Sequence, residues 1–108
     1  MKRVVITGLG AITPIGNTLK EYTDGLKNGT SGAGLITKFD TTNFKTKFAC
    51  EIKGLTISDH IPRKEARRMD GFTQLAMIVA EEAIKDSGID LNLIDLDRAG
   101  CILSLIHI

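Results

Sequence analysis

The chain has 108 residues, of which 43% are hydrophobic and 25% charged, with a formal net charge of +1. These values are typical of one globular domain and exclude a disordered acidic tail or a low-complexity filament. No apolar run approaches the ~18 residues that a membrane helix needs, and the near-neutral charge gives no general signal for nucleic acid.

The first predicted element is a strand over residues 4–7, where a β-branched run stops at Gly8. A continuous apolar run of this kind favours a buried strand in a sheet covered on both faces. Gly8 and Gly10 then form a glycine-rich turn, which suggests phosphate binding. However, Thr13 stands where the nucleotide-binding pattern has its third glycine, and Pro14 disturbs the turn. Close packing at a strand end is therefore the favoured explanation of the two glycines.

A short helix is predicted next, with Thr18 and Glu21 as a capping box and Asn28-Gly29 as its end. Residues 30–43 are predicted to form an irregular surface loop with a turn at 40–43. Alternating apolar residues over 47–52 predict a half-exposed edge strand.

The longest predicted helix covers about residues 62–86 and ends at Ser87-Gly88. Its middle is apolar on nearly all faces, which predicts burial between layers or in an interface. Gly71 lies inside this helix, where glycine costs about 1 kcal/mol relative to alanine, so it predicts close packing. A polar connection and a last strand over residues 99–108 complete an α/β chain.

Positive charge is concentrated in residues 63–68, which carry a net +3 while the remainder carries −2. Lys64, Arg67 and Arg68 have i, i+3, i+4 spacing, which places them on one face of the predicted helix. Cations near a helix N-terminus oppose its dipole, so stability does not explain them. A solvated basic face and a site for an anionic partner both remain open. The lack of interleaved aromatic residues argues against single-stranded nucleic acid.

The remaining reactive side chains suggest no catalytic or metal centre. Cys50 and Cys101 are far apart and lack CxxC spacing, so we expect no metal site and no disulfide, and a reduced, cytoplasmic setting. His60 and His107 have no acid or nucleophile at a recognisable spacing. No cofactor is expected either.

Three ordered segments resemble the opening of a β-ketoacyl-[acyl carrier protein] synthase, most closely type II. They are residues 4–17 (VVITGLGAITPIGN), 39–41 (FDT) and 63–70 (RKEARRMD). The resemblance covers residues 1–102 and implies an incomplete, N-terminal part of a thiolase-like α/β/α/β/α fold, whose parent is expected to be a homodimer.

The resemblance also implies a function in fatty acid biosynthesis. An acyl group is transferred from its thioester to a cysteine, malonyl-[acyl carrier protein] is decarboxylated, and a carbon–carbon bond forms. The family's catalytic cysteine and two histidines match none of Cys50, Cys101, His60 and His107, so no catalytic residue is assigned and we expect the chain itself to be inactive. The family's carrier-protein docking positions correspond to Lys64, Arg67 and Arg68. These three residues become the candidate docking site.

Residues 103–108 depart from the family pattern, and we interpret them as a non-native tail of a truncated or misassembled gene. Residues 1–102 are then a partial domain, which we expect to be weakly stable alone. Two alternatives remain: a polyketide ketosynthase or chain-length factor, and a small non-catalytic module that docks the acidic carrier protein.

Overall fold

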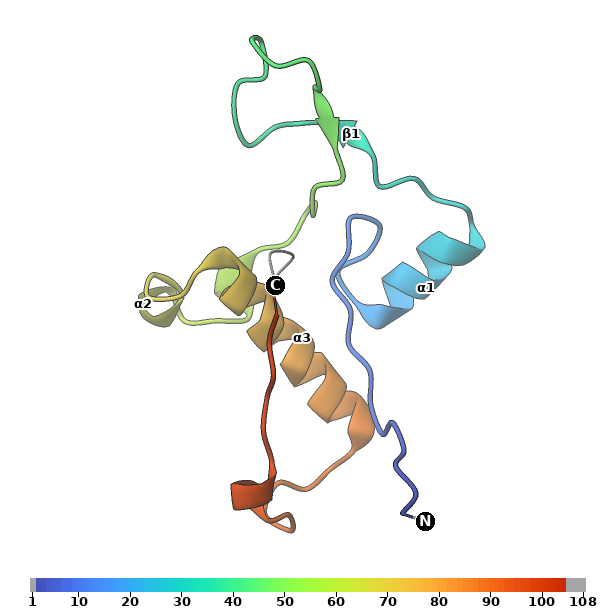
Figure 1. The fold of residues 1–108 in the computed structure, drawn as a ribbon, viewed down its shortest axis with the longest axis vertical. Helices are drawn as coiled ribbons and strands as arrows, with labels where there is room; N and C mark the ends of the chain where they lie inside the picture. The colour runs from blue at the N-terminus through green and yellow to red at the C-terminus, as the bar shows by residue number, and fades with distance from the viewer. Residues whose placement is uncertain (1, 105–108) are drawn as a thin grey trace.

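The computed structural model describes residues 2–104, which combine helices with one small sheet (Figure 1). The helices are α1 (Leu19–Lys27), α2 (Arg63–Ala66) and α3 (Gly71–Ser87), with 3₁₀ turns η1 (Ile57–Asp59) and η2 (Leu96–Arg98). Strands β1 (Gly34–Leu35) and β2 (Phe48–Ala49) pair antiparallel, with Gly34 opposite Ala49. None of the helices in this part of the chain has the length and apolarity to cross a membrane.

The molecule is open, with few residues shielded from water. Its radius of gyration is 17.0 Å, whereas a compact domain of this length has about 13 Å. Ile61 and Ile78 are the buried hydrophobic side chains of the described residues, each 6% exposed. The β1–β2 hairpin lies at one end, the η2 turn lies at the other, and α3 runs between them (Figure 1).

The predicted strand at residues 4–7 is wrong: this segment is extended without strand pairing, and Val4 and Ile6 are 95% and 83% exposed. A strand needs a neighbour to accept and donate its backbone hydrogen bonds, and no described segment pairs with this one. The predicted last strand fails for the same reason over residues 99–104. Its remaining residues, 105–108, lie outside the described part of the chain.

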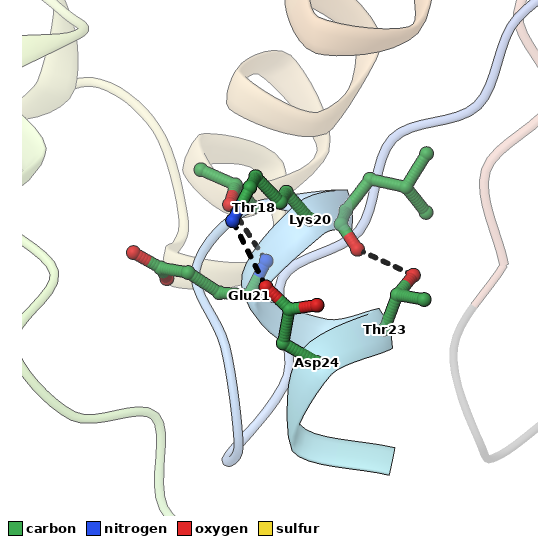
Figure 2. Close-up of polar contacts among 6 residues, drawn as sticks. Thr18, Lys20, Glu21, Thr23 and Asp24 are labelled. Carbon is green, nitrogen blue, oxygen red and sulfur yellow. Dashed lines mark hydrogen bonds and ion pairs between the residues drawn. The ribbon is translucent and has the colours of Figure 1, made fainter. Parts of the chain in front are cut away.

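Helix α1 forms as predicted, and its N-terminus is capped from both sides. The Thr18 hydroxyl accepts a hydrogen bond from the Glu21 N–H (3.2 Å), and the Glu21 carboxylate accepts one from the Asn17 N–H (2.7 Å). The Thr23 hydroxyl donates to the Leu19 carbonyl within the helix (Figure 2). The helix ends at Lys27 with Asn28 as its C-terminal cap, and Gly29 follows with φ +64°, a left-handed conformation that favours glycine.

The hairpin confirms both the turn at residues 40–43 and a strand within 47–52, although the strand is only two residues long. Asp40 accepts hydrogen bonds from the Thr42 N–H (2.9 Å) and hydroxyl (2.6 Å). The rings of Phe39 and Phe44 meet edge to face, with their centroids 5.6 Å apart. The partner strand β1 lies in the segment predicted to be irregular.

The single long helix predicted over residues 62–86 is wrong, because the chain breaks between α2 and α3. Asp70 is extended (φ −66°, ψ 156°). The Gln74 side-chain amide donates to the carbonyls of Ala66 (2.8 Å) and Met69 (3.2 Å), which satisfies backbone groups that a continuous helix would have used itself. Gly71 begins α3 with open space around it, so the predicted close packing there is also wrong.

The predicted burial of this helix on nearly all faces is not found in the described residues. In α3 only Ile78 is buried, whereas Met77 is 52% exposed. The apolar surface of α3 is therefore only partly covered.

Candidate functional site

The glycine-rich turn lies directly on helix α3. A Cβ atom added to Gly8 would meet the Ala83 carbonyl at 2.2 Å, and one added to Gly10 would meet the Val79 carbonyl at 2.3 Å. Both are far inside van der Waals contact, so only glycine lets the two backbones approach this closely. Close packing of the two glycines is confirmed, although against a helix and not at the end of a strand.

Two carboxylates of α3 accept hydrogen bonds from backbone N–H groups of this turn. The Leu9 N–H donates to Asp86 and the Ala11 N–H to Glu82, both at 2.9 Å. The second oxygen of Glu82 accepts from the Leu19 N–H at 2.8 Å. A phosphate would need these same donors and would face two negative charges. The arrangement therefore opposes nucleotide binding.

Glu82 is a structural residue that none of the sequence patterns had indicated. It joins the glycine-rich turn, the start of α1 and the middle of α3 through one carboxylate. Its i, i+4 spacing from Asp86 places two acids on one face of α3, opposite the Gly8-x-Gly10 turn. Two acids at i, i+4 spacing on a helix, together with a glycine-rich turn elsewhere in the chain, were the sequence signal that could have predicted this contact.

The basic segment forms helix α2 and the turn that follows it. Lys64 lies in the helix, Arg67 is its C-terminal cap, and the Arg68 N–H still bonds the Glu65 carbonyl at 2.9 Å. The break at Asp70 places Arg67 and Arg68 at the C-terminal end of α2, where a helix dipole favours positive charge, whereas Lys64 stays near the N-terminus of this single turn. The expectation that the cations lie at the N-terminus of a long helix is therefore wrong for Arg67 and Arg68.

The cations of this segment are exposed and unpaired within the described residues. Lys64, Arg67 and Arg68 are all exposed, and neither ion pair of residues 2–104 involves them. Those pairs are Lys20–Asp24 (2.9 Å; Figure 2) and Lys85–Glu81 (2.8 Å). The structure therefore presents the three predicted residues together as free positive charge on one short segment.

The cysteines and histidines considered in the sequence do not form a common site in the described residues. Cys50 and Cys101 are exposed, free thiols. His60 lines a cavity of about 170 Å³ together with Glu81 and Lys85; His107 lies outside the described residues. Hydrogen bonding to Lys85 lowers the pKa of Glu81, with a smaller contribution from the charge of His60. Within residues 2–104, no three His, Cys, Asp or Glu side chains are grouped as metal ligands.

Residues 1–107 match the family model described as "Beta-ketoacyl synthase, N-terminal domain". The chain belongs to the β-ketoacyl synthase family. The resemblance inferred from the three ordered segments is thereby confirmed.

Two curated relatives of this β-ketoacyl synthase chain are both named "3-oxoacyl-[acyl-carrier-protein] synthase 2". The chain is 48% identical over 99 residues to the Staphylococcus aureus (strain COL) protein, covering 92% of this chain and 24% of the relative. It is 44% identical over 102 residues to the Synechocystis sp. protein, covering 94% of this chain and 24% of that one. The chain thus spans about a quarter of the length of these relatives.

A solved structure described as "The ishigamide ketosynthase/chain length factor" has the same fold over most of the chain. The TM-score is 0.70 at 37% sequence identity, covering 82% of this chain and 22% of that one. The likeness places the described helices and small sheet in a ketosynthase architecture.

Proposed function

We propose that this chain acts in the decarboxylative condensation of an acyl thioester with malonyl-[acyl carrier protein], and that its own contribution is to dock the carrier protein. The docking residues are Lys64, Arg67 and Arg68. The observation that carries the proposal is the exposure of these unpaired cations on one segment, in a family whose relatives act on a carrier protein according to their names.

The electrostatics of α2 support docking more than catalysis. Cations on an exposed rim raise the rate of encounter with an acidic protein and fix its orientation, and they add less to final affinity. Their attraction is screened by salt over ~10 Å at 0.1 M. Binding is therefore expected to weaken as salt rises.

The proposed chemistry needs a thiolate whose pKa is lowered and histidines that stabilise an enolate. Cys50, Cys101 and His60 do not meet in the described structure. We therefore propose that the 108-residue chain does not itself catalyse condensation.

The remaining proposals follow from the family. They are a thiolase-like layered fold in a homodimeric parent, a cytoplasmic setting, and residues 1–102 as the unit that carries the docking segment.

The docking role is tested by titrating the chain with purified acyl carrier protein in an isothermal calorimeter at several salt concentrations. Lys64→Glu is expected to weaken binding about tenfold at low salt and to reduce its salt dependence. Lys27→Glu, which makes the same charge change at the end of α1, is the matched control and should leave affinity nearly unchanged. Equal effects of the two variants would show that only net charge matters, and would reject a defined docking segment.

A second candidate is a polyketide ketosynthase or chain-length factor. It is favoured by one observation, the fold shared with the ishigamide ketosynthase/chain length factor. The higher identity, 44–48%, is to the proteins named as synthase 2. Comparing binding of a fatty-acid carrier protein with that of a polyketide carrier protein distinguishes the two, since the preferred partner indicates the pathway.

A further inference from the structure

A cavity of about 460 Å³ is enclosed by three separate segments of the chain. Lys38 comes from the β1–β2 hairpin, residues 52–57 form a second wall, and the first two turns of α3 form the third. The apolar side chains that line it are Ile52, Leu55, Ile57, Phe72 and Leu75. We call this space the hairpin–α3 cavity. Its volume lies within the ~300–1,000 Å³ that is typical of sites for small molecules.

The apolar lining is in place before any ligand binds. Its four aliphatic side chains are already partly buried, and Phe72 is 38% exposed. Gln74, which also lines the cavity, donates hydrogen bonds to the carbonyls of Ala66 (2.8 Å) and Met69 (3.2 Å), and these bonds hold the start of α3. A site that is ordered in advance loses less entropy when it binds a ligand.

The charge at this cavity comes from Lys38, whose side chain is exposed and forms no ion pair within residues 2–104. Glu51 lies within electrostatic reach of it. Hydrogen bonding to the Thr37 hydroxyl (2.8 Å) lowers the pKa of Glu51, and the charge of Lys38 contributes further. Glu51 does not line the cavity, and its oxygens already accept bonds from Thr37. The three N–H donors of the Lys38 ammonium group therefore remain available to an anion bound in the cavity.

The volume and the lining together restrict the class of ligand. At ~30 Å³ for each carbon-sized group, the space accepts an apolar body of about eight to ten carbons with room left at its open side. One cation suits one negative charge, and a second charge on the ligand would lie against apolar walls at a cost in desolvation. The cavity around His60 does not have this character, because Glu81, Glu82 and Lys85 bring both signs of charge into a space of about 170 Å³.

We propose that the hairpin–α3 cavity binds a free monocarboxylate whose apolar body has about eight to ten carbons. The apolar body packs against Leu55, Phe72 and Leu75, and the carboxylate pairs with Lys38. A neutral alcohol, ester or thioester of the same length lacks the charge that Lys38 recognises. The inference goes beyond the proposed function, because the ligand is a small molecule and its site contains none of the three docking residues.

The test is an NMR titration of the full 108-residue chain with sodium octanoate, with calorimetry to measure the affinity. A contact of this size predicts a Kd of about 0.1–1 mM. Amide shifts should saturate and be confined to residues that line the cavity. The comparison ligand is 1-octanol, which keeps the apolar body without the charge and is expected to bind about fivefold more weakly.

Two variants separate the charge from the cavity. Lys38→Met keeps the length of the side chain and should reduce octanoate affinity about fivefold, to the level of 1-octanol. Lys45→Met makes the same change at an exposed position of the same hairpin, outside the cavity, and should bind normally. Gly71 lines the cavity and has open space around its Cβ position, so Gly71→Leu should fill the cavity without a clash and weaken both ligands about tenfold. Gly100→Leu, which also meets open space but lies outside the cavity, is its control.

Four results would each overturn the proposal. The first is the absence of saturable binding up to about 5 mM octanoate, well above the expected Kd. The second is equal affinity for octanoate and 1-octanol, which would leave Lys38 without a role. The third is equal loss in Lys38→Met and Lys45→Met, which would indicate general charge attraction. The fourth is wild-type affinity in Gly71→Leu with unchanged circular dichroism, which would place the ligand outside the cavity.

Discussion

The Glu82 carboxylate accepts a hydrogen bond from the Leu19 N–H at 2.8 Å, between residues 63 positions apart. Leu19 is the first residue of α1, and its N–H is one of the helix donors that no backbone carbonyl can satisfy. The capping residue Thr18 bonds the N–H of Glu21, so the N-terminus of α1 is completed partly from its own turn and partly from α3.

Glu82→Gln is expected to loosen this junction, because the amide can present only one oxygen where two N–H groups need acceptors. An unsatisfied, part-buried donor costs about 1–3 kcal/mol. Hydrogen exchange at the Ala11 or Leu19 amide should therefore accelerate roughly tenfold, as measured by NMR. Glu81→Gln is the control, because Glu81 makes its ion pair only with exposed Lys85 and should leave both amides unchanged.

Gly10→Ala is expected to displace the N-terminal segment from α3, because its Cβ would overlap the Val79 carbonyl. Cross-peaks between residues 8–11 and α3 in nuclear Overhauser spectra should weaken or vanish. Gly71→Ala has open space around its Cβ and should preserve them. Intact cross-peaks in both variants would contradict the close backbone approach.

Acid should weaken the β1–β2 hairpin locally. The Thr42 hydroxyl and N–H lower the pKa of Asp40, and the Thr37 hydroxyl lowers that of Glu51, from ordinary values of 3.8 and 4.5. A carboxyl group with a lowered folded pKa stabilises the folded form above its unfolded pKa, and that contribution is lost as pH falls through the folded pKa. We expect the contribution of these two carboxylates to hairpin order to be complete above about pH 4.5 and to fall progressively below the ordinary values.

The pH dependence is checked by following the Asp40 and Glu51 carboxyl carbons during an NMR titration. Thr42→Ala should return the Asp40 midpoint toward 3.8. Thr41→Ala, in the same turn but with only its backbone carbonyl engaged, should leave the midpoint in place. Identical midpoints in the wild type and Thr42→Ala would contradict the assigned cause.

The isolated chain is expected to unfold over a broad range of temperature and urea concentration. Its described core contains only two buried hydrophobic side chains, Ile61 and Ile78, and cooperative unfolding depends on apolar area that becomes exposed in one step. Circular dichroism at 222 nm should show a shallow transition. A steep, two-state transition of the monomer would refute this expectation.

Local sequence signals predicted the local structure well. The Thr18–Glu21 cap, the Gly29 stop and the Asp40 turn each depend on residues within a few positions, and all three are present. The strand at residues 4–7 was wrong because strand formation requires a partner, which no local pattern can supply. The break at Asp70 was missed because the side chain that stabilises it, Gln74, looks like an ordinary helical residue.

The candidate site was partly visible in the sequence. The spacing of Lys64, Arg67 and Arg68 indicated a cationic face, and the structure shows these residues exposed on one segment. A cavity of about 460 Å³ was not visible in the sequence, because Ile57 and Leu75, which both line it, belong to separate elements. Periodicity within one helix carries no information about such contacts.

The sequence separation across the Glu82 carboxylate also constrains the order of events during synthesis. Its partners Ala11 and Leu19 precede it by 71 and 63 residues. At ~5–20 residues per second, roughly 3 to 13 s pass between translation of Leu19 and of Glu82. During that interval the glycine-rich turn and the first turn of α1 lack their acceptors. The beginning of this chain therefore reaches its final conformation only after helix α3 has left the ribosome.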